Sequence, residues 1–93
     1  MEIPVASVEQ IEASFGKQEL MRAIGASLAH VSSGNIRIEL LPGPGNAQQH
    51  GYVHAGAVAA IADTAAGYAA KTLMPAGRTV LTTEFKINLL APA

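Results

Sequence analysis

Asp63 is the residue whose neighbours in the sequence most clearly indicate chemistry. It is the only aspartate in the chain, and it stands in the stretch HAGAVAAIADTAAGYAA, which begins at His54 and is otherwise almost entirely alanine and glycine. At about 100° per residue of an α-helix, every side chain within about 60° of Asp63 is very small. These neighbours are Gly56, Ala59, Ala60, Ala66, Gly67 and Ala70. A face this small lets a ligand or another helix approach the carboxylate closely.

Two interpretations of this carboxylate are open. In the first, Asp63 is an ordinary exposed residue on the solvent face of a helix. In the second, it lies in a partly dry cleft and acts as a nucleophile or a general base. We favour the second, because solvent faces are normally rich in Lys, Glu and Gln, and aspartate is a mediocre helix former.

The loop before this helix supplies a complementary group. The backbone N–H groups of Ala55 and Gly56, at a helix N-terminus, can polarise a carbonyl and stabilise an oxyanion. Ala55 precedes Asp63 by eight residues, which is roughly 12 Å along a helix axis. A donor and a carboxylate that act on one carbonyl must lie within about 6 Å of each other. Two antiparallel helices related by a twofold axis satisfy this condition, so the spacing predicts a site shared between two chains.

The remaining sequence predicts an α+β fold around this helix. Ser7 is suited to cap a helix over 8–15, a second short helical piece is closed by Gly25, and Ser33-Gly34 suggests a turn between two strands. The other expected elements are strands over 27–32 and 36–40, the helix over 55–73 and a long alternating strand over 78–90, which Pro92 ends.

Composition narrows the function classes. The chain has 93 residues, 49% hydrophobic and 14% charged, with a net charge of −1 and no cysteine. One domain is expected, with part of its surface committed to a partner chain and no tendency to bind nucleic acid. Disulfides and thiolate chemistry are excluded, and neither a membrane span nor a signal peptide is evident, so we expect a cytoplasmic protein.

Two linked motifs resemble the PaaI-like (phenylacetate-pathway) group of hotdog-fold acyl-CoA thioesterases. They are His54-Ala55-Gly56 and, on the helix, Ala62-Asp63-Thr64-Ala65. The stretch TTEFKINLLAPA is also similar to the third strand of that family. The resemblance implies an antiparallel sheet wrapped around a long central helix, with residues 1–93 forming a single domain that is incomplete at its C-terminus. It further implies a homodimer, or a tetramer built as a dimer of dimers.

The resemblance also implies residue roles. The catalytic carboxylate of the family falls on Asp63, its polar Asn or Gln on Gln48, and its oxyanion N–H on Ala55, where the family usually has glycine. His54, Gly56 and Thr82 fall at substrate-binding positions. The expected reaction is hydrolysis of an aryl-acetyl or medium-chain acyl-CoA to free acid and CoA, without a cofactor beyond the CoA of the substrate.

One alternative function, the role of His54 and a possible metal site are weighed beside this prediction. A non-catalytic hotdog module that binds acyl-CoA, or serves only in assembly, is compatible with Ala55 and with the missing strands. For His54 we favour a structural hydrogen-bonding role at the helix start over a direct catalytic role. A metal site at His50 and His54 is not expected, because no third ligand is nearby.

Overall fold

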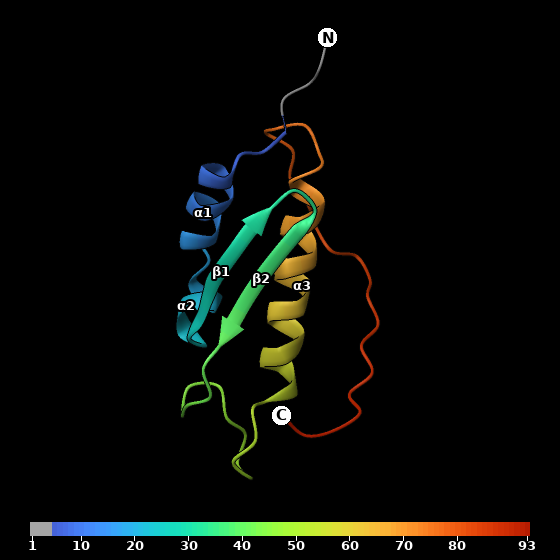
Figure 1. Cartoon of the computed structure of the whole chain (residues 1–93). Coiled ribbons are helices and arrows are strands. Elements are labelled where there is room, and N and C mark those ends of the chain that lie inside the picture. Colours follow the sequence, from blue (N-terminus) through green and yellow to red (C-terminus); the bar gives the residue numbers. More distant parts are fainter. Residues whose placement is uncertain (1–4) are drawn as a thin grey trace.

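The structure, a computed structural model, describes residues 5–93. Two short helices and a β-hairpin precede one long helix, and an extended segment follows it (Figure 1). The elements are α1 (Val8–Gly16), α2 (Glu19–Ala23), β1 (Ala26–Ser32), β2 (Asn35–Leu40) and α3 (Ala55–Lys71). Within the described part of the chain, no helix is both long and apolar enough to cross a membrane.

The two N-terminal helices form where the local sequence predicts them. The Ser7 hydroxyl accepts a hydrogen bond from the Gln10 N–H at 3.1 Å, and the Gln10 side chain accepts one from the Ser7 N–H at 2.8 Å. This reciprocal capping box satisfies two N–H groups that the first turn of a helix would otherwise leave unpaired. The expected helix over 8–15 is therefore confirmed, and it extends by one further residue to Gly16. The expected second helical piece is confirmed as α2.

The hairpin of β1 and β2 is antiparallel, and the turn at Ser33-Gly34 is confirmed. Gly34 has a φ of +69°, a conformation that glycine adopts at no steric cost. Ile36 and Ile38 are half-buried whereas Arg37 between them is exposed, as the alternation predicts. The hairpin thus presents one apolar face, and β2 packs against α3.

Helix α3 contributes Tyr68 to a small core. Tyr68 is buried together with Ile11 of α1, and Phe15 packs against them. The Tyr68 hydroxyl forms hydrogen bonds with the Ser14 hydroxyl at 3.0 Å and with the Gln18 amide at 2.8 Å. Tyr68 is 6% exposed and joins α3 to α1 and to the connection between α1 and α2.

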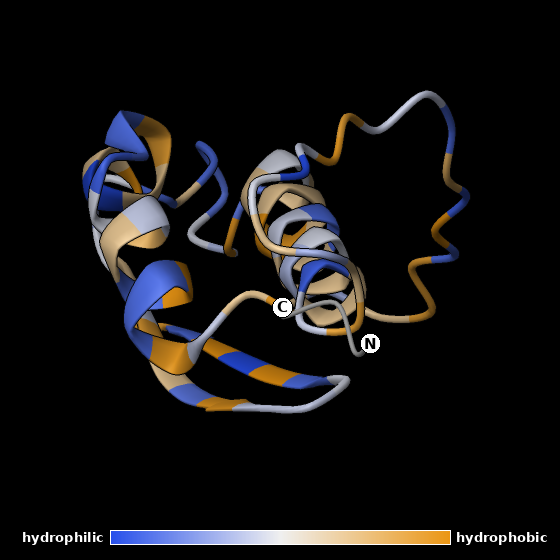
Figure 2. Ribbon diagram, turned by 90° about the horizontal axis from the view of Figure 1, so that it is seen from above, coloured by the Kyte–Doolittle hydropathy of each residue, from blue (hydrophilic) through white to orange (hydrophobic). Residues whose placement is uncertain are grey.

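The predicted strand over 78–90 is wrong for the described structure. This segment is extended but unpaired, and in Figure 1 it runs beside α3, away from the hairpin. Its apolar residues alternate with polar ones (Figure 2), yet Leu81, Phe85 and Leu89 are 82%, 50% and 54% exposed. Alternation predicts a pleated surface, but a strand also needs a neighbouring strand for its hydrogen bonds. Among residues 5–93 the sheet has only two strands, so the segment has no such neighbour.

Helix α3 ends two residues earlier than expected. Lys71 is its last residue, and Thr72 follows as its C-cap. The buried Thr72 hydroxyl donates to the Ala69 carbonyl and accepts from the Gly34 N–H, both at 2.7 Å. One hydroxyl thus connects the end of α3 with the turn of the hairpin.

Asn46 organises the loop between β2 and α3. Its buried side-chain amide donates to the carbonyls of Ile24 and Leu41, both at 2.9 Å, and its side-chain oxygen accepts from the Gly43 N–H at 3.1 Å. Its backbone carbonyl accepts from the His54 N–H at 2.7 Å. One residue therefore holds the end of α2, the end of β2 and the start of α3 together.

We expect Asn46→Ala to lower the free energy of unfolding by about 2–3 kcal/mol. The substitution leaves three partly buried backbone groups without these partners, and each such group carries a desolvation cost. Urea denaturation measures the change. Asn88→Ala, at an exposed asparagine of the extended segment, is the matched control. Equal effects of the two substitutions would show that the Asn46 contacts contribute little.

Candidate active site

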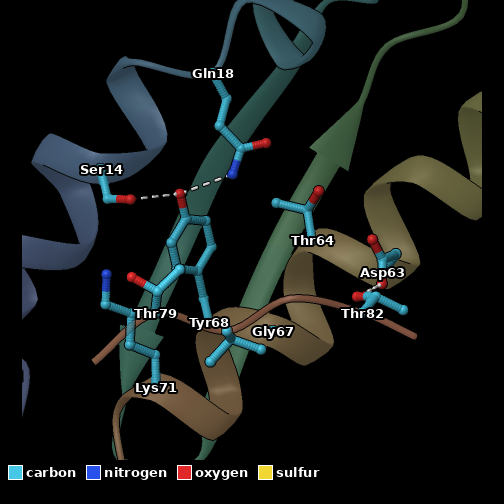
Figure 3. Close-up of a pocket in the computed structure, with 10 residues that line it drawn as sticks. Ser14, Gln18, Asp63, Thr64, Gly67, Tyr68, Lys71, Thr79 and Thr82 are labelled. Atoms are coloured by element: carbon cyan, nitrogen blue, oxygen red, sulfur yellow. Dashed lines mark hydrogen bonds between the residues drawn. The ribbon is translucent and has the colours of Figure 1, made fainter. Parts of the chain in front are cut away.

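Asp63 lies half-buried in the middle of α3. Its Oδ1 accepts a hydrogen bond from the Thr82 hydroxyl at 2.5 Å (Figure 3). Thr82 belongs to the extended segment, so this bond ties that segment to the helix. Oδ2 of Asp63 has no hydrogen-bond donor among residues 5–93. One carboxylate oxygen is thus held in place while the other remains open for a reaction.

A cavity of about 220 Å³ adjoins this carboxylate. Polar side chains dominate its wall: Ser14 and Gln18 come from the N-terminal helical region, Lys71 from the end of α3 and Thr79 from the extended segment (Figure 3). Sequence reasoning missed these four residues. Lys71 is on the same helix as Asp63, but a separation of eight residues places it about 80° around the axis and roughly 12 Å along it, so the spacing gives only a weak signal. Ser14 and Gln18 carry none, because only tertiary packing brings them to α3.

His54 caps the start of α3. Its Nδ1 accepts a hydrogen bond from the Gly56 N–H at 2.7 Å. A Cβ at position 56 would lie 2.9 Å from that nitrogen, so a larger residue there would displace the imidazole from this position. The structural role expected of His54 is therefore confirmed.

The Gly56 N–H is therefore not free to bind a substrate carbonyl, contrary to the prediction from the sequence. The sequence predicts that the N–H groups of both Ala55 and Gly56 polarise a carbonyl, but the Gly56 N–H already donates to Nδ1 of His54. The Ala55 N–H has no hydrogen-bond acceptor among the described residues. Ala55 therefore offers the open donor at this helix start.

Gln48 lies near Ala55 in a different cavity from Asp63. Its Oε1 accepts from the N–H groups of His50 at 2.5 Å and Tyr52 at 3.3 Å, which shapes the loop before α3. Gln48 and Ala55 both line a cavity of about 700 Å³ that is closed on one side by residues 88–93. The end of the chain reaches this region because the Val53 N–H donates to the Ala93 carbonyl at 2.7 Å.

The structure thus brings Asp63 and Thr82 together but keeps them apart from Gln48 and Ala55. Helix α3 is a single α-helix from Ala55 to Lys71, so Ala55 and Asp63 are roughly 12 Å apart along its axis. A carbonyl bound at Ala55 is therefore beyond reach of Asp63 of the same chain.

No metal site is indicated by the side chains that the structure describes. Between residues 5 and 93 there is no group of three or more His, Asp and Glu residues placed to hold an ion.

Comparison with known proteins places this geometry in context. Residues 50–93, which include both His54 and Asp63, match a family model. That family is the Thioesterase superfamily. No curated protein sequence matches the chain significantly.

The chain is also similar to a solved structure, a thioesterase family protein from Silicibacter pomeroyi. The two share 40% sequence identity with a TM-score of 0.84, and the match covers 89% of this chain and 61% of that protein. The α+β architecture described above therefore matches the fold of that thioesterase family protein, of whose length this chain spans less than two thirds.

Proposed function

We propose that this chain acts in a thioesterase that hydrolyses an acyl-CoA to free acid and CoA. The observation that carries the proposal is the Asp63 carboxylate, which is held at Oδ1 by Thr82, open at Oδ2 and adjacent to a polar cavity. The match of residues 50–93 to the Thioesterase superfamily supports thioester hydrolysis as the reaction. We further propose a PaaI-like specificity, for an aryl-acetyl or medium-chain acyl group.

Two routes through Asp63 give the same products. As a general base, Oδ2 takes a proton from water, and the resulting hydroxide attacks the thioester carbonyl carbon. The C–S bond then breaks, and the proton passes to the departing CoA thiolate. As a nucleophile, Oδ2 attacks the carbon itself, expels the thiolate and forms a mixed anhydride that water hydrolyses. In both routes the Thr82 hydroxyl orients the carboxylate.

The thioester carbonyl oxygen needs a hydrogen-bond donor close to Asp63, and the same chain does not supply one there. We propose that the donor is the Ala55 N–H of a second copy, with Gln48 of that copy next to it. An antiparallel pair of α3 helices brings each Asp63 to the other helix start, and the small side chains around Asp63 permit a close approach. The proposed enzyme is therefore a homodimer or a dimer of dimers.

A non-catalytic module is the second candidate, and one observation favours it. The Gly56 N–H already donates to His54, so of these two N–H groups only that of Ala55 is open. The methyl group of Ala55 narrows the space through which a thioester reaches this donor. Such a protein would bind acyl-CoA without cleaving it.

A direct assay separates the two candidates. We expect the protein to release free thiol from phenylacetyl-CoA or octanoyl-CoA, with a kcat on the order of 1–10³ s⁻¹ for a preferred substrate. A thiol-reactive dye measures the product, and protein-free buffer gives the background rate. Saturable binding of both compounds, measured by calorimetry, together with no turnover would instead support the binding module.

A further inference from the structure

A separate cavity lies between α2 and the first turns of α3. Its volume is about 310 Å³, and its walls include Leu20 and Ile24 on the α2 side and Gly56, Ala57 and Ala60 on the α3 side. Ala60 precedes Asp63 by three residues, so the two share one face of the helix. The cavity therefore lies about one helical turn from the proposed catalytic carboxylate.

The wall of this cavity is largely apolar, and the ring Nε2 of His54 is its one side-chain nitrogen without a hydrogen-bond partner among the described residues. Asn46 lines it, but both hydrogens of its side-chain amide and its side-chain oxygen are bound to backbone groups. His54 also lines it, and its Nδ1 is bound to the Gly56 N–H. No Asp, Glu, Lys or Arg among the described residues contributes to the lining. A charged group would find no oppositely charged side chain here, whereas an uncharged apolar group would contact the aliphatic side chains of the wall.

The size of the cavity limits its occupant. A water molecule takes a share of roughly 30 Å³ in the liquid, so 310 Å³ accommodates a group of about ten non-hydrogen atoms. The CoA half of a thioester is much larger and carries several phosphate charges. An octanoyl or phenylacetyl group is uncharged and of suitable size.

We propose that this cavity holds the acyl group of the substrate, and that Leu20 and Ile24 set the length of the chain that it accepts. The proposal rests on the proposed thioester hydrolysis and adds the part of the protein that selects the acid. Leu20 is the better position to vary, because it is 57% exposed and lies outside the buried core. Its substitution changes the cavity without removing core packing.

The experiment compares two variants of opposite effect. Leu20→Ala enlarges the cavity and Leu20→Phe narrows it, while Leu41→Ala removes the same kind of side chain from an 82% exposed position that does not line the cavity. We measure kcat/KM for butanoyl-, hexanoyl-, octanoyl- and decanoyl-CoA. One methylene in an apolar pocket changes kcat/KM by about tenfold or more. We therefore expect Leu20→Ala to raise the ratio of decanoyl- to hexanoyl-CoA at least about tenfold, and Leu20→Phe to lower it by a similar factor.

The experiment distinguishes failure of the cavity proposal from failure of the proposed reaction. If the wild type is active and neither Leu20 variant changes the chain-length profile relative to Leu41→Ala, the acyl group binds elsewhere and the cavity proposal is wrong. If the wild type hydrolyses no thioester, binding of octanamide, an uncharged analogue of the acyl end, is measured by calorimetry. Octanamide affinity that falls in Leu20→Phe but not in Leu41→Ala then supports the cavity as a binding site although hydrolysis has failed. Affinity that is equal in all three proteins overturns it.

Discussion

The Asp63→Asn variant is expected to hydrolyse acyl-CoA at least about a hundredfold more slowly in kcat than the wild type, with KM nearly unchanged. Asparagine has the same shape as aspartate, and its side-chain oxygen still accepts the hydrogen bond from Thr82. It does not take a proton from water and is a poor nucleophile. The effect therefore falls on the chemical step and leaves substrate binding intact. Steady-state kinetics with the preferred acyl-CoA measure both constants.

The matched control for this variant is Glu84→Gln. Glu84 is an exposed carboxylate on the same extended segment as Thr82, and its neutralisation changes the net charge by the same amount. We expect kcat within about twofold of the wild type, because exposed charges have small effects on their surroundings. Hydrolysis by Asp63→Asn at the wild-type rate would remove the catalytic role of Asp63.

The second large effect is expected from mixing two inactive variants. One carries Asp63→Asn and the other Gln48→Glu, which keeps the side-chain oxygen that accepts from the N–H groups of His50 and Tyr52 but removes the amide donor. If each site combines Gln48 and Ala55 of one chain with Asp63 of another, a mixed dimer contains one intact site of two. Random pairing makes half of the dimers mixed, so activity rises towards about a quarter of the wild-type value.

Subunit exchange must be shown independently for this mixture. Mass spectrometry of isotope-labelled and unlabelled chains measures the fraction of mixed dimers. If mixed dimers form and no activity returns, each site lies within one chain, and the distance argument from Ala55 to Asp63 fails.

The elements that could be predicted are those specified by neighbours in sequence. Ser7 and Gln10 form α1 through contacts three residues apart, the turn at Gly34 needs only its own conformation, and the alternation of β2 marks its apolar face. Asp63 could be singled out because a carboxylate surrounded by glycine and alanine is unusual on a helix.

The features that could not be predicted depend on contacts far apart in the chain. Strand pairing is such a contact, and the alternation over 78–90 does not reveal whether a neighbouring strand is present. The cavity beside Asp63 forms because Ser14 and Gln18 contact Tyr68 of α3. Ser14 and Tyr68 are more than fifty positions apart in the sequence. Asn46 appears in sequence as an ordinary loop residue, and only the folded loop shows what its amide holds.

The burial of Tyr68 gives the protein an intrinsic optical reporter. The chain contains two tyrosines and no tryptophan, so tyrosine dominates its near-ultraviolet absorption and emission. Tyr52 is 50% exposed in a loop, whereas Tyr68 is 6% exposed and hydrogen-bonded to Ser14 and Gln18. Most of the spectral change on losing the folded state therefore originates at Tyr68. Detachment of α1 from α3 is thus visible without a label, which allows the motion of this wall of the Asp63 cavity to be followed in the unmodified protein.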